Sequence, residues 1–526
     1  MIPIPSEVIL IWYLPDLDPM FSIGNPQDNK KSDNLYNFAT IPRPFRCNME
    51  DLLKMALRLS SSSGAKYSEA RHQSDTGFSF FVKNGLLEVS RSYRSEGLSI
   101  RVIVDGALGF SSTNELSRPS VRRAAERAVS SAKATSSLAK PPVQLSSEDL
   151  SKSKFIIKPR IRFENVELDQ AVELIRDSDK AAIEIAGKRS VKMVSRFLTI
   201  FSGVTEKTVI NSDGAEISSS VPRTAFNYML IGSHPQKGTA MRSSQFGESG
   251  GWEVIEKGDV MQVMEKEGES MAKVLDLGKP SPMEKIDVLL GSEVVALICH
   301  ESSGHPGEAD RILGREAAQA GESYLSINSV GMEVGSPLVN VVDDPTLRNS
   351  YGFYLYDEEG VKARKRYLIK EGRITEFLQN RETAAVTGMK SNGASRASSY
   401  NREPIVRMAN TYMEAGDRSF QELIEDIKKG VYVRNFTEWN IDDRRFNQRY
   451  VGFEAFLVEN GEITDPVRNP AIEMTTVGLY KAVDAVGEDL RFWSATCGKG
   501  DPSQGIPVWT GGPTIRLRDV RLGGAF

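Results

Sequence analysis

The chain has 526 residues, 40% of them hydrophobic and 26% charged, with a formal net charge of −4. This length allows two or more domains with full cores, and the composition is that of an ordinary globular protein. The slightly negative charge argues against nucleic acid and anionic membranes as partners. Three scattered cysteines, Cys47, Cys299 and Cys497, do not make a disulfide framework, so we expect a reducing, cytoplasmic environment.

Residues 1–48 differ in composition from the rest of the chain. Seven prolines crowd this stretch, and proline at such density prevents both helix and central strand. The apolar run at residues 8–14 is too short to cross a bilayer and lacks the basic flank of a signal peptide. We therefore expect residues 1–48 to lie outside the fold, as an upstream extension of the reading frame. Trp12 and Tyr13 leave a docking arm open as the alternative.

Residues 49–134 are expected to form a helix, antiparallel strands and a second helix. The segment 49–59 is amphipathic with helical spacing. Asn-Gly at 84–85 and Asp-Gly at 105–106 each lie between apolar runs and favour tight hairpin turns. A capping serine and an early proline then predict a helix over residues 117–129.

The following stretch continues the alternation of helices and strands. Helices are predicted at residues 167–188 and 259–275, and a long strand at 191–210. Residues 49–280 therefore read as an N-terminal α+β domain, in which helices cover an antiparallel sheet.

Residues 281–526 predict a second, β-rich domain. A short apolar strand at 286–290 precedes a helix at 294–299 that is apolar on all sides and should be buried. Hairpin signals then recur at 371–372 and 460–461, between segments that alternate like strands. We expect an α+β chain whose C-terminal domain is barrel-like, partly closed on itself, and carries the functional site.

Two histidines and a glutamate, His300, Glu301 and His305, lie within six positions directly after the buried helix. Neutral imidazoles bind a borderline metal such as zinc, and the adjacent carboxylate can accept a proton from water that the metal acidifies. Five positions separate the histidines, which places them roughly 140° apart around a regular helix. The helix must therefore widen into a π-type turn or stop at Gly304. The alternative is a helix end with two histidines satisfied by ordinary hydrogen bonds.

A catalytic zinc usually takes three protein ligands and leaves one position open, so a third ligand is needed. Cys497 lies in a glycine-flanked polar loop, where Lys499 favours its thiolate form. Glu308 is the next candidate because it follows the second histidine closely. The remaining candidates are Asp310, Cys299, His72 and His234. Of these, Cys299 is expected to point away from its neighbour and into the core.

Four motifs along the chain resemble those of one enzyme family. They are HExxGH followed by EAD at 300–310, NGASR at 392–396, RMANT at 407–411 and CGK at 497–499. Together they resemble the TldD branch of the TldD/PmbA metallopeptidases, over roughly residues 49–526. Where that family often has His-Ala-Arg, this chain has Ala-Ser-Arg at 394–396.

The resemblance implies a zinc-dependent peptidase. His300, His305 and Cys497 would hold Zn²⁺, and Glu301 would be the catalytic base. The resemblance also implies a homodimer, or a heterodimer with a PmbA-like subunit, that encloses the metal in a cleft reached only by short or unfolded peptides. The PmbA-like branch lacks the metal residues that this chain keeps, which favours the active branch.

Two other functions have to be weighed. Residues 247–251 fit the G-x-S-x-G pattern of serine hydrolases, but the polar residues before them do not look like the strand that a nucleophile elbow needs. A flexible glycine loop is the better interpretation. A non-catalytic peptide-binding scaffold would hold a structural metal with a fourth ligand from Glu308 or Asp310. The acidic groups at 343–344 and 357–359 are expected to be solvated turns, with a second-metal role as the alternative.

Overall fold

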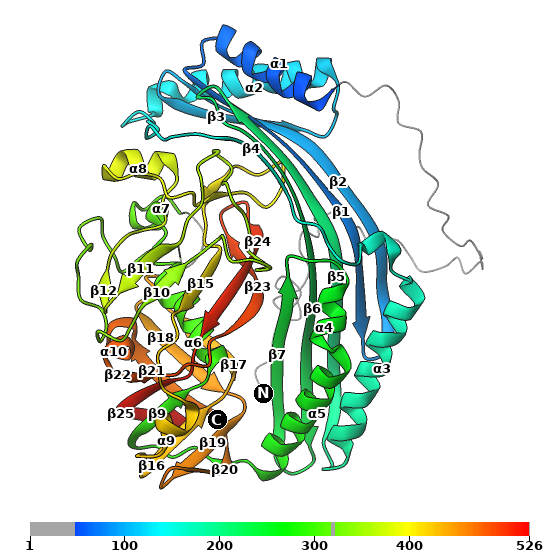
Figure 1. Cartoon of the computed structure of the whole chain (residues 1–526), viewed down its shortest axis with the longest axis vertical. Helices are drawn as coiled ribbons and strands as arrows, with labels where there is room; N and C mark the ends of the chain where they lie inside the picture. Colours follow the sequence, from blue (N-terminus) through cyan, green and yellow to red (C-terminus); the bar gives the residue numbers. More distant parts are fainter. Residues whose placement is uncertain (1–47, 317–320, 525–526) are drawn as a thin grey trace.

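The computed structural model describes residues 48–316 and 321–524, so the prediction for the proline-rich extension lies almost wholly outside the described residues. Figure 1 shows an α+β architecture with a strongly curved N-terminal sheet that faces a second, strand-rich domain. This confirms the predicted fold class. No helix in the described part of the chain is both long and apolar enough to cross a bilayer.

Seven strands form the N-terminal sheet, in the order β3-β2-β1-β5-β6-β4, and β7 also pairs with β6. All neighbours are antiparallel except β4 and β6. The strands are β1 (Tyr67–Lys83), β2 (Leu86–Val104), β3 (Ala107–Thr113), β4 (Lys152–Ile156), β5 (Lys192–Asn211), β6 (Glu216–His234) and β7 (Gly238–Glu248). The predicted turns at 84–85 and 105–106 are present, but a single long strand, β2, joins them.

Helices cover two parts of this sheet (Figure 1). They are α1 (Met49–Ser62), α2 (Arg118–Thr135), α3 (Leu168–Gly187), α4 (Glu253–Gly258) and α5 (Val260–Leu277), with 3-10 turns at Ser136–Leu138 and Phe163–Asn165. The first two helices share a core with one end of the sheet, around Leu53, Ile100 and Val121. The helices α3 and α5 share a second core with the other end, around Ile175 and Met271.

The C-terminal domain is built on a ten-stranded and a six-stranded sheet. The ten-stranded sheet has the order β17-β18-β21-β25-β9-β16-β19-β20-β8, with β22 also pairing β25. Its strands are β8 (Lys279–Pro280), β9 (Lys285–Leu290), β16 (Lys429–Val433), β17 (Phe436–Ile441), β18 (Asn447–Gly452), β19 (Ala455–Glu459), β20 (Glu462–Arg468), β21 (Pro470–Thr475), β22 (Val483–Val486) and β25 (Ile515–Gly524).

The six-stranded sheet has the order β12-β11-β10-β15-β24-β23, and β13 pairs with β14 separately. The strands are β10 (Val341–Asp343), β11 (Arg366–Lys370), β12 (Arg373–Ile374), β13 (Ser395–Arg396), β14 (Ile405–Val406), β15 (Asn410–Met413), β23 (Arg491–Lys499) and β24 (Gln504–Gly512). The helices are α6 (Ser292–Cys299), α7 (Ala309–Ile312), α8 (Arg381–Thr387), α9 (Phe420–Ile424) and α10 (Thr476–Lys481). We propose residues 49–280 and 281–526 as the two domains, because the helix α5 ends at Leu277 and the C-terminal sheets, apart from the two-residue β8, begin at Lys285.

Buried ion pairs join the N-terminal sheet to the C-terminal domain. Arg101 on β2 binds Glu359 at 2.8 Å, and Arg71 on β1 lies 3.3 Å from Glu358. Asp343 is likewise fully buried and pairs with Arg366. The expectation of solvated acidic turns at 343–344 and 357–359 was therefore wrong. Glu358 and Glu359 instead pair with arginines of the N-terminal sheet, and Asp343 pairs with Arg366 on the neighbouring strand β11, which a single sequence does not reveal.

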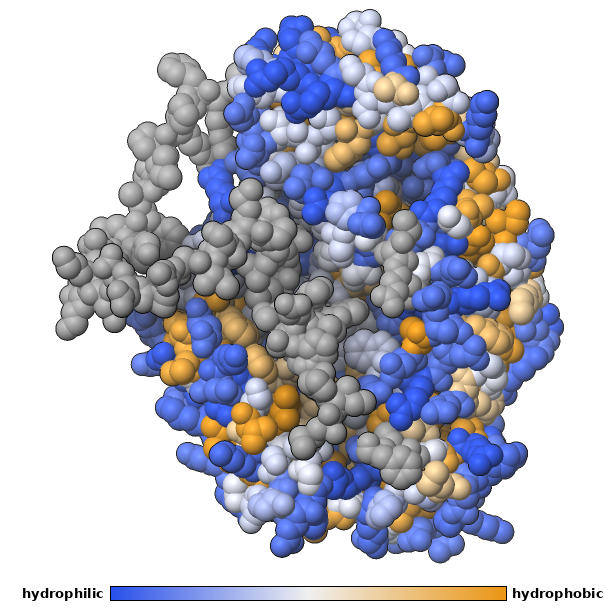
Figure 2. Space-filling view, turned by 180° about the vertical axis from the view of Figure 1, so that it is seen from behind, coloured by the Kyte–Doolittle hydropathy of each residue, from blue (hydrophilic) through white to orange (hydrophobic). Residues whose placement is uncertain are grey.

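On the face opposite to that of Figure 1, hydrophilic residues cover most of the surface and hydrophobic residues gather in smaller groups (Figure 2).

Candidate metal centre

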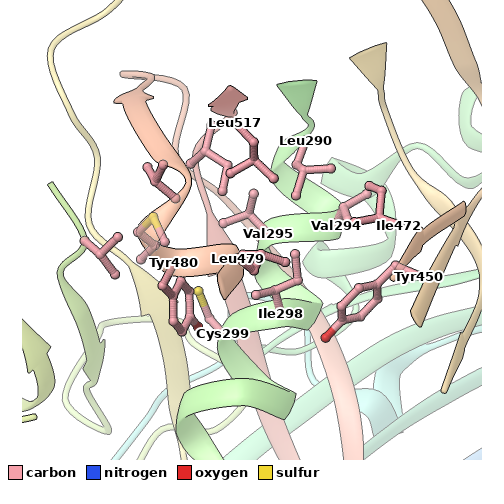
Figure 3. Close-up of a cluster of buried hydrophobic side chains, with 14 of the residues drawn as sticks. Leu290, Val294, Val295, Ile298, Cys299, Tyr450, Ile472, Leu479, Tyr480 and Leu517 are labelled. Atoms are coloured by element: carbon pink, nitrogen blue, oxygen red, sulfur yellow. The ribbon is translucent and has the colours of Figure 1, made fainter. Parts of the chain in front are cut away.

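A tightly packed helix delivers the His-Glu motif. The helix α6 directly follows β9 and is surrounded by apolar side chains from several strands and from α10 (Figure 3). The labelled members of this cluster are Leu290, Val294, Val295, Ile298, Cys299, Tyr450, Ile472, Leu479, Tyr480 and Leu517. Because such interiors are close-packed, the C-terminal end of α6 has little freedom to move.

The chain forms a π-helical turn over His300–Gly304, which is the first of the two outcomes that the five-residue spacing allowed. The N–H of His305 donates to the carbonyl of His300 at 3.1 Å, which is the bond that a π turn requires. The two imidazole rings therefore face the same space, with centroids 4.8 Å apart and planes at 80°. Gly304 is needed because a Cβ at that position would overlap Met408.

Cys497, on β23, completes the group. Its Sγ lies 3.4 Å from Nε2 of His305, and one ligand atom each from His300, His305 and Cys497 all lie within 4.8 Å of one another. In a tetrahedral zinc site with bonds of ~2.0–2.3 Å, neighbouring ligand atoms are roughly 3.3–3.6 Å apart. Nδ1 of His300 is buried without a hydrogen-bond partner among the described residues. The residues present thus fit a zinc ion.

Glu308 supports the site instead of adding a ligand. Its Oε2 accepts from Nδ1 of His305 at 3.0 Å and from Nε of Arg311 at 2.7 Å, and Nζ of Lys499 lies 3.3 Å away. Burial opposes the charge, but Lys499, His305 and Arg311 hold the pKa of Glu308 well below its usual value. A carboxylate on the far ring nitrogen orients a metal-binding histidine and raises its basicity.

The thiol of Cys497 is arranged to ionise. Burial alone would raise its pKa, but His305, His300 and Arg407 lower the pKa of Cys497 well below the usual value. Arg407 also donates to the carbonyl of Cys497 and, at 2.9 Å, to that of Gln504. Lys499, which the sequence suggested as the activating cation, binds Asp310 at 2.6 Å in addition to its contact with Glu308.

Glu301 is buried and forms an ion pair with Arg445. Burial would raise its pKa, but Arg445, His305 and His300 together lower the pKa of Glu301, so the side chain is a carboxylate at neutral pH. Sequence reasoning missed Arg445, which lies in the turn between β17 and β18 with φ 61°. Nothing in its local sequence distinguishes it from its neighbour Arg444, because only the folded hairpin brings it to Glu301.

The other ligand candidates lie elsewhere. Cys299 points into the core, as expected, and burial raises the pKa of its thiol to about 12. His72 lies 3.2 Å from Glu96 on the N-terminal sheet, and Nδ1 of His234 accepts from the backbone of Gln236 at 3.2 Å. Asp310 binds Lys499, as described above.

The G-x-S-x-G segment lacks a catalytic setting. It does join a strand, β7, to a helix, α4, contrary to the sequence analysis. The hydroxyl of Ser249, however, is buried and donates to the backbone carbonyl of Ser350 at 2.7 Å. A hydroxyl held by a main-chain oxygen has no base to activate it. The loop is also buried, so it is a packed connection and not the flexible loop that the sequence predicted.

Comparison with known proteins agrees with this site. Family profiles described as PmbA/TldA metallopeptidase domain 1, central domain and C-terminal domain match residues 68–132, 161–278 and 283–524. A metalloprotease of Methanothermobacter thermautotrophicus is 32% identical over 459 residues, covering 87% of this chain and 96% of that protein. A metalloprotease TldD homolog of Haemophilus influenzae is 25% identical over 499 residues, covering 92% and 98%. A zinc metalloprotease TldD homolog of Saccharolobus solfataricus is 28% identical over 357 residues, covering 67% and 76%.

Solved structures share the fold. A putative modulator of a DNA gyrase from Thermotoga maritima superposes with a TM-score of 0.70 at 19% identity, over 90% of this chain and all of that one. TldE from Thermococcus kodakarensis gives a TM-score of 0.68 at 18% identity, again over 90% of this chain and all of that one. The fold, the profile matches along most of the chain and the named relatives agree: this chain is a metallopeptidase of the PmbA/TldD family, in its TldD branch.

Proposed function

We propose that the protein is a zinc-dependent peptidase that hydrolyses short or unfolded peptides, with His300, His305 and Cys497 as metal ligands and Glu301 as the base. The observation that carries the proposal is the convergence of two imidazoles and a thiol within 4.8 Å, beside a buried carboxylate. The name of the Saccharolobus relative, a zinc metalloprotease, supports the choice of metal.

Zinc bound there would polarise a peptide carbonyl and acidify water. Glu301 takes the proton from the attacking water and passes it to the leaving amine. Arg445 holds the carboxylate of Glu301 in one place through their ion pair. Glu308 fixes the ring orientation of His305, and Arg407 holds the backbone of Cys497.

A scaffold with a structural metal is the second candidate function. Structural zinc sites normally close with four protein ligands. The described residues provide a group of three, and Glu308 and Asp310 are engaged by Lys499. This favours an open coordination position and therefore catalysis.

We further propose that the active unit contains two subunits, either two copies of this chain or this chain with a PmbA-like partner. The similarity to TldE supports a partner with the same fold. The cytoplasm is the proposed compartment, since Cys299 and Cys497 are both free thiols.

The test measures zinc content and turnover of an unfolded peptide library by the full chain, with and without a PmbA-like subunit. Glu301→Gln should keep zinc but lose about 10²-fold or more in kcat, because the general base is removed. The exposed Glu462→Gln is the matched control and should behave like the parent. Full turnover by Glu301→Gln would reject the mechanism, and a zinc-loaded parent that cleaves no peptide under either condition would favour the scaffold.

A further inference from the structure

A cavity lies between the N-terminal sheet and the C-terminal domain. It has a volume of about 60 Å³, and its lining comes from β4, β5 and β6 on one side and from residues 353–358 and 395–396 on the other. None of the proposed metal ligands lines it. Since one water needs roughly 10–15 Å³ measured this way, the cavity has room for a few waters or one compact ion.

Arg223, on β6, brings a guanidinium group without an ion pair to this cavity. Its Nε donates to the carbonyl of Tyr351 at 2.8 Å and its Nη2 to that of Phe353 at 3.0 Å. Both acceptors are neutral. Within the described residues, Arg223 forms no ion pair and its Nη1 makes no hydrogen bond, although the carboxylate of Asp75 acts on it electrostatically.

Arg396 adds a second charge of the same kind. It is buried, donates to the carbonyls of Met408 at 2.6 Å and Pro507 at 3.0 Å, and lies 5.1 Å above the ring of Tyr354. Burial lowers the pKa of Arg396 to about 10, so it remains a cation at neutral pH. It too forms no ion pair with any residue that the structure describes.

The carboxylates at the cavity do not balance these guanidinium groups. Glu358 is engaged by Lys207 and lies 3.3 Å from Arg71. Asp357 accepts backbone N–H groups, at 2.9 Å from Val361 and 3.1 Å from Ser395, and burial raises its pKa well above the usual value. Arg396 therefore remains a buried cation without a counter-charge, and such a charge is costly unless a ligand supplies its counterpart.

Ser395 provides an independent sign of a ligand. Its side chain is fully buried and lines the cavity, yet its Oγ has no hydrogen-bond partner among the described residues. Buried hydroxyls usually have a partner, so the hydroxyl of Ser395 is available to donate to a ligand in the cavity that Arg223 and Arg396 also line.

We propose that this cavity binds a compact oxyanion, with the guanidinium groups of Arg223 and Arg396 and the hydroxyl of Ser395 as its donors. Guanidinium groups match the geometry of carboxylate and phosphate oxygens, and the volume is too small for a nucleotide. The oxyanion is either a free small anion or the carboxylate of a bound peptide. The rim is reachable from solvent, since Arg223 and Lys207 are only partly buried.

This site does not depend on peptidase activity, and its test avoids activity altogether. Thermal unfolding of the full chain is followed during titration with inorganic phosphate or acetate, at ionic strength held constant with chloride. Metal-loaded and chelator-treated protein are compared, so that anions bound at the metal are recognised. A saturable rise in Tm in both forms is expected, because a ligand that binds only the folded state stabilises it.

Arg223→Gln and Ser395→Ala should each weaken the apparent affinity for the anion at least tenfold. Ser395→Ala removes only one hydroxyl group, so it tests the site even if Arg223→Gln fails to fold. Arg122→Gln, an exposed arginine on α2, is the matched control and should bind like the parent. A peptide with a free carboxyl terminus and its C-terminal amide are then tested as competitors of phosphate. Competition by the free acid alone assigns the site to peptide carboxylates, and competition by neither peptide assigns it to free anions. Absence of any anion-specific shift, or unchanged affinity in both cavity variants, would overturn the proposal.

Discussion

Sγ of Cys497 lies 3.4 Å from Nε2 of His305, although 192 positions separate the two residues in the chain. The sulfur belongs to the strand β23 and the imidazole ring follows the helix α6. These two segments must pack together before the three metal ligands lie close to one another. The metal centre is therefore a product of the completed fold.

Replacing Cys497 with alanine should abolish metal binding. Two imidazoles alone hold zinc far more weakly than a set that includes a thiolate. We expect less than one tenth of the parent's zinc content and peptide turnover reduced by about 10²-fold or more, in line with the usual loss of a catalytic centre. Metal analysis and a peptide assay on the same preparation measure both.

Cys299→Ala is the matched control for that change. Cys299 lies in the core beneath the motif, so its replacement should cost about 1 kcal/mol of stability and leave the zinc content unchanged. Equal zinc loss in both cysteine variants would contradict the assignment of Cys497.

Replacing Arg445 with alanine should slow turnover and spare metal binding. The ion pair with Glu301 would be lost, so the carboxylate would sample several orientations. We expect kcat to fall by roughly 10–10²-fold with a small change in KM, and Arg445→Lys to restore part of the loss. Arg444→Ala, the exposed neighbour, should match the parent; the same loss there would point to hairpin distortion.

Gly304→Ala should disturb the π turn. The new methyl group would overlap the sulfur of Met408, so either this side chain or the turn must shift. A loss of about 1–3 kcal/mol and reduced zinc affinity are expected, as is usual for overpacking. Thermal unfolding and zinc titration measure the two effects.

Two further variants test whether steric overlap causes the loss of stability in Gly304→Ala. Met408→Ala in the Gly304→Ala background should recover part of the stability, and Gly498→Ala, where a methyl group meets open space, should be tolerated. Additive losses in the double variant would show that the two side chains do not meet.

The interdomain carboxylate Glu358 should make stability pH-dependent. Burial would raise its pKa, but Lys207 and Arg71 lower the pKa of Glu358 below the ordinary value of 4.5. A lowered folded-state pKa means that the contribution is complete above pH ~4.5 and disappears as the pH falls through the folded-state value.

Glu358→Gln should therefore cost about 3–5 kcal/mol at pH 7, since it leaves buried cations unpaired. The difference in the free energy of unfolding between this variant and the parent should shrink below pH ~4.5, where both proteins carry an uncharged side chain at position 358. Denaturant unfolding between pH 3 and pH 7 measures it; a difference that stays constant with pH would exclude the ion pair as its cause.

Local signals in the sequence determined much of the fold. The turn dipeptides at 84–85 and 105–106, the capped helices and the five-residue spacing of His300 and His305 depend on neighbours within a few positions. The structure has a turn or a helix at each of these places. The polar residues and glycines around Cys497 also marked it as a ligand candidate, although the expected loop was wrong, because Cys497 lies on the strand β23.

Only the tertiary structure decided which charges meet. Glu301 pairs with Arg445, which is distant in the sequence, and Glu308 contacts His305. Glu358 is buried beside Arg71, although its position in the sequence would equally allow it to face solvent. Their positions follow from strand order and register, which depend on the balance of burial and pairing over the whole molecule. A periodic pattern reports which face of an element is apolar, but it carries no information about the distant side chain that neutralises a buried charge.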